Sequence, residues 1–163
     1  MFRNAIQNDL QFIYDLYMHP QVNSYLLYEL MTIEEFKPIY EKLLEDGIKY
    51  VFEDENGTAI GMFKIFPWTH RSSHIAYLGG LAIHPDYTGK GFGVKMMQEI
   101  IELANQQGFK RIELSVATEN LRAIKLYKKV GFKEEGIMRK YTYLKLEERF
   151  LDELLMSYIF NEN

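Results

Sequence analysis

Three glycines alternate with other residues just before a helical pattern begins, and this segment has the residue types best suited to chemistry. They are Gly89, Gly91 and Gly93, within the run from Ile83 to Val94. Glycine lets the backbone approach a phosphate closely with its N–H groups exposed, and the first turn of a helix adds unpaired N–H donors and the positive end of the helix dipole. The spacing indicates an anion site, although glycines that merely turn the chain would give the same pattern.

Two common phosphate-binding motifs do not fit this segment. A P-loop needs Ser or Thr after its lysine, but Lys90 is followed by Gly91. A dinucleotide fingerprint needs a third glycine where Val94 stands, and it places the glycines directly after a strand. Glu113 lies at the acidic position of that fingerprint, but inside a predicted strand rather than at its end.

The elements before the glycines follow from periodicity. We expect residues 1–48 to be helical. Apolar residues recur at helical spacing from Ile6 to Tyr17. A second helix is expected to start at the capping box Thr32–Glu35 and to end at Gly47. From residue 49 the period changes to two, which predicts strands over 49–53, 58–66 and 73–83. Asn56-Gly57 predicts a type I′ hairpin turn between the first two, Pro67 ends the second, and Gly79-Gly80 marks a bulge or a close backbone approach in the third.

After the glycines the pattern becomes helix, strand, helix and two strands. The first helix has Val94, Met97, Ile101 and Ala104 on one face and ends at Gly108, and the second covers 120–130. We expect Leu121, Ile124 and Tyr127 of the second helix to point inward. Strands are predicted over 111–116, 132–143 and 150–160. A meander followed by a strand–helix–strand unit predicts a single mixed α/β domain over 1–163, with helices on both faces of its sheet.

Composition and charge limit the class of function. The chain has 163 residues, no cysteine and a net charge of −4, which excludes disulfides, thiolate metal ligands and cysteine nucleophiles. Residues 1–60 contain eleven acidic and four basic residues (−7), and residues 61–163 contain twelve and fifteen (+3). A basic part facing a small polyanion and an acidic part facing a cation fit this asymmetry, as does scattered solvated charge. Nucleic acid would need a more basic protein.

Other classes of site are also disfavoured. The four histidines have no metal-ligand spacing, so no metal is predicted. The first residues lack the apolar core of a signal peptide, and no apolar run reaches the roughly 18 residues of a membrane span. We therefore expect a cytoplasmic protein with no membrane partner.

Two segments together resemble the GNAT superfamily of N-acetyltransferases. The run 84–93 is similar to the family's acyl-CoA signature, which ends in Gln/Arg-x-x-Gly-x-Gly/Ala and maps onto Thr88, Gly91 and Gly93, with Thr88 departing from Gln/Arg. The run 120–132 is similar to the family's next helix, in which Asn-x-x-Ala-x-x-Leu-Tyr precedes Gly-Phe. Two motifs in the right order, separated by one helix and one strand, are far more specific than either alone.

The resemblance implies a fold and a co-substrate. The fold would be a mostly antiparallel, centrally splayed sheet of six or seven strands with helices on both faces, and acetyl-CoA would be the acetyl donor. The resemblance covers about residues 49–160 as the acyl-CoA-binding core, and residues 1–48 would form the family's variable substrate lid. Residues 150–156 are also similar to bacterial members that acetylate small amines or amino acids.

The same resemblance implies contacts to the cofactor. Backbone N–H groups from Gly89 to Val94 would hold the pyrophosphate, with Lys90 the best side chain for a phosphate contact, and the backbone of 81–83 would pair with the pantetheine arm like an added strand. Asn120 would hydrogen-bond the amide arm, unless it only caps its helix. The implied cofactor-binding residues are Leu81, Ala82, Ile83, Thr88, Gly89, Lys90, Gly91, Phe92, Gly93, Val94, Asn120, Ala123 and Tyr127.

Tyr127 matches the family's general acid. A phenol has a pKa of about 10, so it is protonated at neutral pH and can donate a proton to a leaving thiolate; on spacing alone it would be a core aromatic. A base or water relay must also take a proton from the amine. Many relatives place Glu about where Tyr77 or Leu78 stands, and it is missing here. The candidates are Glu29, His70, His74 and Glu153, among which the sequence does not decide.

The sequence therefore predicts an acetyl-CoA-dependent N-acetyltransferase that acts on a primary amine of a small molecule, an amino acid or a polyamine. An acidic lid would favour a cationic amine. Two alternatives stay open: a non-catalytic acyl-CoA-binding or sensing module, and a protein N-terminal acetyltransferase. Exposed aromatic residues leave a homodimer open as well.

Overall fold

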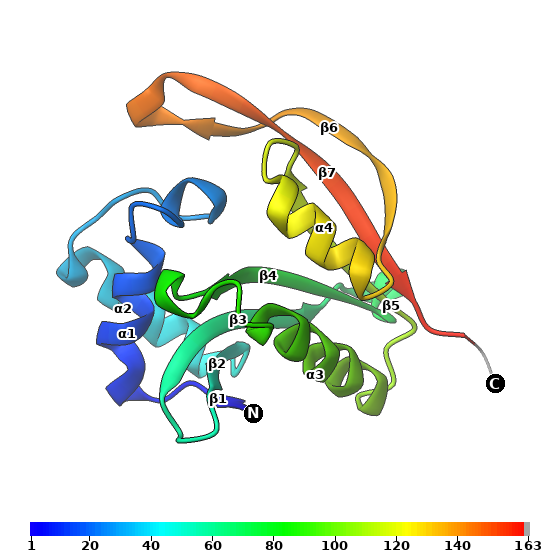
Figure 1. Cartoon of the computed structure of the whole chain (residues 1–163), viewed down its shortest axis with the longest axis horizontal. Coiled ribbons are helices and arrows are strands. Elements are labelled where there is room, and N and C mark those ends of the chain that lie inside the picture. Colours follow the sequence, from blue (N-terminus) through cyan, green and yellow to red (C-terminus); the bar gives the residue numbers. More distant parts are fainter. Residues whose placement is uncertain (162–163) are drawn as a thin grey trace. The chain divides into compact units, whose positions relative to one another are not determined.

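The computed structural model describes residues 1–161, which form a seven-stranded sheet and four α-helices (Figure 1). The sheet order is β1-β2-β3-β4-β5-β7-β6. The strands are β1 (Phe2–Asn4), β2 (Lys49–Glu53), β3 (Ala59–Pro67), β4 (Ile75–Ile83), β5 (Arg111–Ala117), β6 (Lys133–Leu144) and β7 (Arg149–Ile159). The helices are α1 (Leu10–Tyr17), α2 (Ile33–Glu45), α3 (Phe92–Gln106) and α4 (Leu121–Lys129).

Strand direction confirms a mixed, mostly antiparallel sheet. The pairs β1–β2, β2–β3, β5–β7 and β6–β7 are antiparallel, and β4–β5 is parallel. The β4–β5 register covers only three residue pairs and ends at Tyr77–Glu113, although both strands continue. A short register of this kind is what a sheet with diverging central strands requires.

By its internal contacts the chain divides into two compact units. The first consists of Met1–Ile65 and Gly80–Phe92, and the second of Phe66–Gly79 and the chain from Gly93 onward. Both β3 and β4 therefore contribute residues to each unit.

In the first unit, α1 and α2 supply most of an apolar core. Ile13, Leu16 and Tyr17 of α1 and Phe36 and Tyr40 of α2 are fully or almost fully buried in it. The predicted capping box is confirmed at the start of α2: the N–H of Thr32 donates to Glu35 Oε2 at 2.8 Å, and the N–H of Glu35 donates to Thr32 Oγ1 at 3.3 Å. Gly47 follows α2 with a φ of +65°, as predicted.

Two local predictions in the first unit are wrong. Residues 2–4 form β1, because even a three-residue segment can pair with the edge of β2, and α1 starts at Leu10, so Ile6 lies before it. The turn after β2 is not type I′, since Gly57 (φ +79°) but not Asn56 has a positive φ. The Asp54 carboxylate accepts the N–H groups of Asn56 and Thr58, both at 2.9 Å, which stabilises a longer loop with a left-handed glycine and a bulge in the strand register.

In the second unit, α3 and α4 follow their predicted ranges, but their buried faces differ from the prediction. The buried residues of α3 are Met96, Met97, Ile100 and Ala104, while Val94 and Ile101 are only half-buried. Leu121 was expected to point inward but is 73% exposed, because it is the first residue of α4. Tyr127 is buried as predicted.

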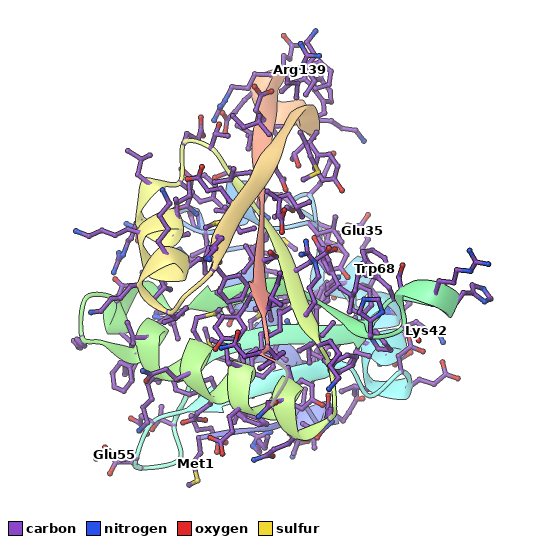
Figure 2. All side chains as sticks on the ribbon, turned by 90° about the vertical axis from the view of Figure 1, so that its right-hand side faces the viewer. Met1, Glu35, Lys42, Glu55, Trp68 and Arg139 are labelled. Atoms are coloured by element: carbon purple, nitrogen blue, oxygen red, sulfur yellow. The ribbon has the colours of Figure 1, made fainter. Side chains whose placement is uncertain are left out.

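The last two strands form a long hairpin, and Arg139 lies toward its far end (Figure 2). Register shifts occur between Met138 and Thr142, where Lys140 has a φ of +52°. Among the helices of residues 1–161, none has the length and apolar character needed to cross a lipid bilayer.

Candidate active site

The glycine segment in the first unit has the conformation expected of an anion site. Gly89 and Gly91 have φ values of +81° and +86°, and a Cβ built on either would meet no atom within 4 Å. Glycine is therefore required there for its left-handed backbone rather than for space. Such turns leave successive N–H groups on one concave side, and the first turn of α3 contains no acidic residue that would offset the helix dipole.

The side chains of this segment hold the loop in place. Thr88 donates its hydroxyl to the carbonyl oxygen of Pro85 at 2.7 Å, and its N–H donates to the same oxygen at 3.1 Å. Thr88 thus ties the loop to the 3-10 turn Pro85–Tyr87, a role that Gln or Arg would not perform in this way. The Lys90 ammonium lies 5.4 Å from the centre of the Tyr87 ring, and that ring packs on Phe92 at 6.1 Å.

The strand end before this loop changes direction at Gly80. Its φ is +54°, and a Cβ there would lie 2.5 Å from Tyr17 Oη, so both conformation and space require glycine. The predicted close approach at this position is made by the Tyr17 and Lys49 side chains and not by another backbone segment. Leu81, Ala82 and Ile83 follow directly, with Ala82 buried and the other two half-buried.

Gly93 has a packing role in the second unit. A Cβ built on it would lie 3.1 Å from Leu126 Cδ2, so glycine lets α4 approach the first turn of α3 closely. Val94 and Ala123 of the same unit are half-buried.

Asn120 caps α4 with its side-chain oxygen and leaves its side-chain nitrogen free. Its Oδ1 accepts the N–H of Ala123 at 3.2 Å. Within residues 1–161 its Nδ2 donates to no other group, and the side chain is half-buried. One end of the amide is therefore used by the helix, and the other is available to a ligand.

Tyr127 combines a buried ring with a free hydroxyl. The residue is 7% exposed, yet its hydroxyl makes no hydrogen bond with the part of the chain that the structure describes. Because no fully buried side-chain nitrogen or oxygen lacks a partner in residues 1–161, this hydroxyl must reach accessible space. Burial, and to a smaller extent the neighbouring Tyr77, raises the pKa of Tyr127 above that of an ordinary phenol. The phenol is protonated at neutral pH.

Tyr77 is one of the two positions, with Leu78, about which the sequence lacks the Glu that many relatives carry. It is half-buried on β4, and its Oη lies 3.4 Å from Ser115 Oγ on β5. Its ring packs against Phe66 at 5.4 Å and against Trp68, labelled in Figure 2, at 5.3 Å. The period-two pattern places Tyr77 on a strand, but only the β4–β5 register brings it next to Ser115.

The candidate bases differ in environment. Glu29, His70 and His74 are exposed, whereas Glu153 on β7 is half-buried and accepts the hydroxyl hydrogen of Thr142. The predicted site residues are distributed over both units. The first unit holds Leu81, Ala82, Ile83, Thr88, Gly89, Lys90, Gly91 and Phe92, and the second holds Gly93, Val94, Asn120, Ala123 and Tyr127.

Comparison with known proteins agrees with this geometry. Residues 10–132 match the model of the acetyltransferase (GNAT) family. The chain is 30% identical over 146 residues to an L-amino acid N-acetyltransferase of Escherichia coli K12, covering 87% of this chain and 88% of that protein. It is 29% identical over 136 residues to a spermidine N(1)-acetyltransferase of Vibrio cholerae serotype O1, covering 80% and 76%.

A solved structure agrees over almost the full length. The crystal structure of a spermidine N-acetyltransferase from Vibrio cholerae in complex with CoA and spermine superposes with a TM-score of 0.86 at 25% identity, covering 98% of this chain and 94% of that one. With a family match over more than half of its length, the chain belongs to the acetyltransferase (GNAT) family.

Proposed function

We propose that this enzyme, an acetyl-CoA-dependent N-acetyltransferase, acetylates a primary amine of a small molecule, either a polyamine or an amino acid. The observation that carries the proposal is Tyr127, a buried phenol whose hydroxyl is free and whose pKa is raised. The named activities of the spermidine and L-amino acid acetyltransferases support the acceptor class. The acidic first 60 residues, with a net charge of −7, favour an acceptor that carries positive charge.

The glycine segment, the end of β4 and Asn120 would together hold the cofactor. The N–H groups of Gly89 to Val94 would bind the pyrophosphate at the first turn of α3, and Lys90 would add a positive charge beside it. The backbone of Leu81–Ile83 would pair with the pantetheine arm, and Nδ2 of Asn120 would donate to it. The cofactor supplies an acetyl thioester, which is already activated toward an amine.

Tyr127 would then act when the thiol leaves. A neutral amine attacks the thioester carbonyl directly, so no covalent enzyme intermediate is needed, and the departing sulfur requires a proton. A phenol with a raised pKa retains its proton at neutral pH, which makes Tyr127 a suitable donor. The proton that the attacking nitrogen loses after bond formation returns to the phenolate.

The test is the release of free CoA thiol from acetyl-CoA in the presence of an amine panel that includes spermidine, spermine and L-amino acids. We expect thiol release with at least one acceptor and a stoichiometric acetylated product. Binding of acetyl-CoA, measured by thermal shift, without turnover on any amine would identify a non-catalytic acyl-CoA-binding module instead. Absence of both binding and turnover would refute the cofactor assignment.

A further inference from the structure

The open question in the proposed reaction is the group that takes the proton from the acceptor ammonium. An alkyl amine has a pKa near 10 and is mostly charged at neutral pH, so it must be deprotonated before it can attack. Many relatives carry Glu about where Tyr77 or Leu78 stands in this chain. A carboxylate from another strand would have to replace that function.

The sheet register places Glu153 on the same face as Tyr77. In the second unit Tyr77 pairs with Glu113 across β4–β5, and Ala117 pairs with Glu153 across β5–β7. Paired residues share a face, and along a strand every second residue does. Residues 113, 115 and 117 are every second residue of β5 and therefore lie on the same face. The side chains on this one face are those of Tyr77, Glu113, Ser115 and Glu153.

Electrostatic coupling agrees with this placement. Burial is the largest cause of the raised pKa of Tyr77. The hydrogen bond with Ser115 lowers this pKa, and the charges of Tyr141, Glu153 and Glu113 raise it. Tyr77 in turn contributes to the raised pKa of Tyr127. Within one unit, Glu153 thus contributes to the raised pKa of Tyr77, and Tyr77 to that of Tyr127.

The two carboxylates on this face differ in their partners. Glu113 accepts hydrogen bonds from Arg111 Nε at 2.8 Å and from Trp68 Nε1 at 3.2 Å, so it has a counter-charge, which it shares with Glu135. Glu153 is bonded only to the hydroxyl of Thr142, and no Lys or Arg of residues 1–161 forms an ion pair with it. A half-buried carboxylate without a counter-charge favours a cation from outside the chain.

Further aromatic residues lie around Tyr77, on the face that Glu153 shares. Tyr77 is packed by Phe66 and Trp68, and the 58% exposed Tyr141 is close enough for its charge to affect Tyr77. Aromatic faces attract ammonium groups without competing for their protons. The combination suits a cationic amine that must lose a proton.

We propose that Glu153 receives the acceptor ammonium on the face it shares with Tyr77 and accepts its proton. Glu153 would then be a catalytic residue of the acetyl transfer, so this inference rests on the function proposed above. In this step the N–H bond of the ammonium breaks, the proton passes to the carboxylate, and the nitrogen lone pair becomes free to attack the thioester carbonyl. The C–S bond then breaks, and Tyr127 protonates the sulfur. Glu153 returns its proton to solvent, so one proton is released per acetyl group transferred.

The test compares Glu153→Gln with the wild type on two kinds of acceptor. The first is the best alkyl amine of the panel, which is protonated at neutral pH, and the second is hydroxylamine, which is already neutral there. Glutamine keeps the size of the side chain and can still accept the Thr142 hydrogen bond. We expect a loss of about 10² or more in kcat/KM for the alkyl amine, a much smaller loss for hydroxylamine, and recovery of the alkyl-amine rate as the pH rises toward the pKa of the amine.

The control is Glu113→Gln, which removes a carboxylate paired with Arg111 from the same face and is expected to leave kcat/KM within about threefold of the wild type. Unchanged acetyl-CoA binding by thermal shift shows that each variant is folded. Equal losses for both acceptors, or no loss for either, would overturn the assignment of Glu153. If the wild type is inactive on every amine, the proposed function fails first, so the two failures are distinguishable.

Discussion

At the scale of single residues, the tyrosines of this chain differ in what their hydroxyls do. Tyr14 donates to the carbonyl oxygen of Met31 at 2.8 Å, Tyr40 donates to that of Ile6 at 2.6 Å, and Tyr17 accepts from Lys49 at 3.0 Å. These hydroxyls are used to hold the first unit together. Tyr127 is also buried, at 7% exposed, but makes no such bond within residues 1–161, and a satisfied core tyrosine would not leave its proton unused.

Replacing Tyr127 by Phe is expected to lower kcat by about 10²–10⁴, because the leaving thiolate loses its proton donor. The KM for acetyl-CoA should change little, since the ring and its packing are retained. Steady-state thiol release measures both constants. Tyr143→Phe, on the exposed part of β6, is the matched control, and a Tyr127→Phe enzyme with normal turnover would remove this residue from the mechanism.

Asn120 offers a second prediction at this scale, because the two ends of its amide have separate tasks. Asn120→Ser keeps an oxygen that can cap α4 but removes Nδ2, so we expect a raised KM for acetyl-CoA with nearly unchanged stability. Asn120→Ala removes both ends and should also lower the free energy of unfolding by about 1 kcal/mol. Urea unfolding combined with acetyl-CoA titration separates the effects, and equal KM values for wild type and Asn120→Ser would contradict the cofactor contact.

At the scale of elements, the loop between β4 and α3 depends on backbone conformation more than on side chains. Gly89 and Gly91 are both left-handed and both surrounded by open space, whereas Gly93 is close to Leu126. Glycine is therefore required at the three positions of this sequence motif for different physical reasons. Two of the glycines set the direction of N–H groups, and the third allows two helices to approach.

This distinction gives a prediction for Gly91→Ala. The added methyl group meets no atom, but an alanine at a φ of +86° costs about 1–2 kcal/mol, and the loop can avoid that cost by changing conformation and losing its N–H arrangement. We expect acetyl-CoA affinity to fall by about tenfold or more, measured by isothermal titration. Gly136→Ala on β6 is the control, because that glycine has neither a positive φ nor a neighbour within 4 Å.

Comparison of elements also shows what the sequence could predict. Features specified by neighbouring residues were predicted correctly, such as the Thr32–Glu35 capping box and the left-handed Gly47. The turn after β2 was predicted wrongly because the Asp54 side chain competes for the backbone N–H groups. That Tyr77 and Glu153 share one face of the sheet could not be predicted, since it depends on the registers of two strand pairs that join distant parts of the chain.

At the scale of the whole molecule, the most unusual group is a lysine in the core. Lys49 on β2 is 1% exposed, and its Nζ donates to Tyr17 Oη at 3.0 Å beside the left-handed Gly80. Its strand partner is Lys64. Burial first, and then the charge of Lys64, lowers the pKa of Lys49 well below its ordinary value of 10.5. Periodicity could not reveal this, because a lysine at the start of a strand is usually exposed.

The lowered pKa of Lys49 should make stability depend on pH. Between the folded-state pKa and 10.5 the unfolded chain binds a proton that the folded chain does not, so the free energy of unfolding rises with pH across this window. The slope from one such group is at most about 1.4 kcal/mol per pH unit. Burial also lowers the pKa of Lys64, which adds to the slope with the same sign.

Lys49→Met fills a similar volume without a titrating group, and we expect it to remove most of this dependence while Lys64 retains a smaller one. Urea unfolding from about pH 7 to about pH 9.5, below the range where tyrosines ionise, measures the slope. Lys42→Met changes an exposed lysine of α2 that is paired with Glu45 and Asp46, and it should keep the wild-type slope. If Lys49→Met keeps that slope too, Lys49 is charged in the folded protein. The inference that its side chain is a neutral amine next to Gly80 would then be wrong.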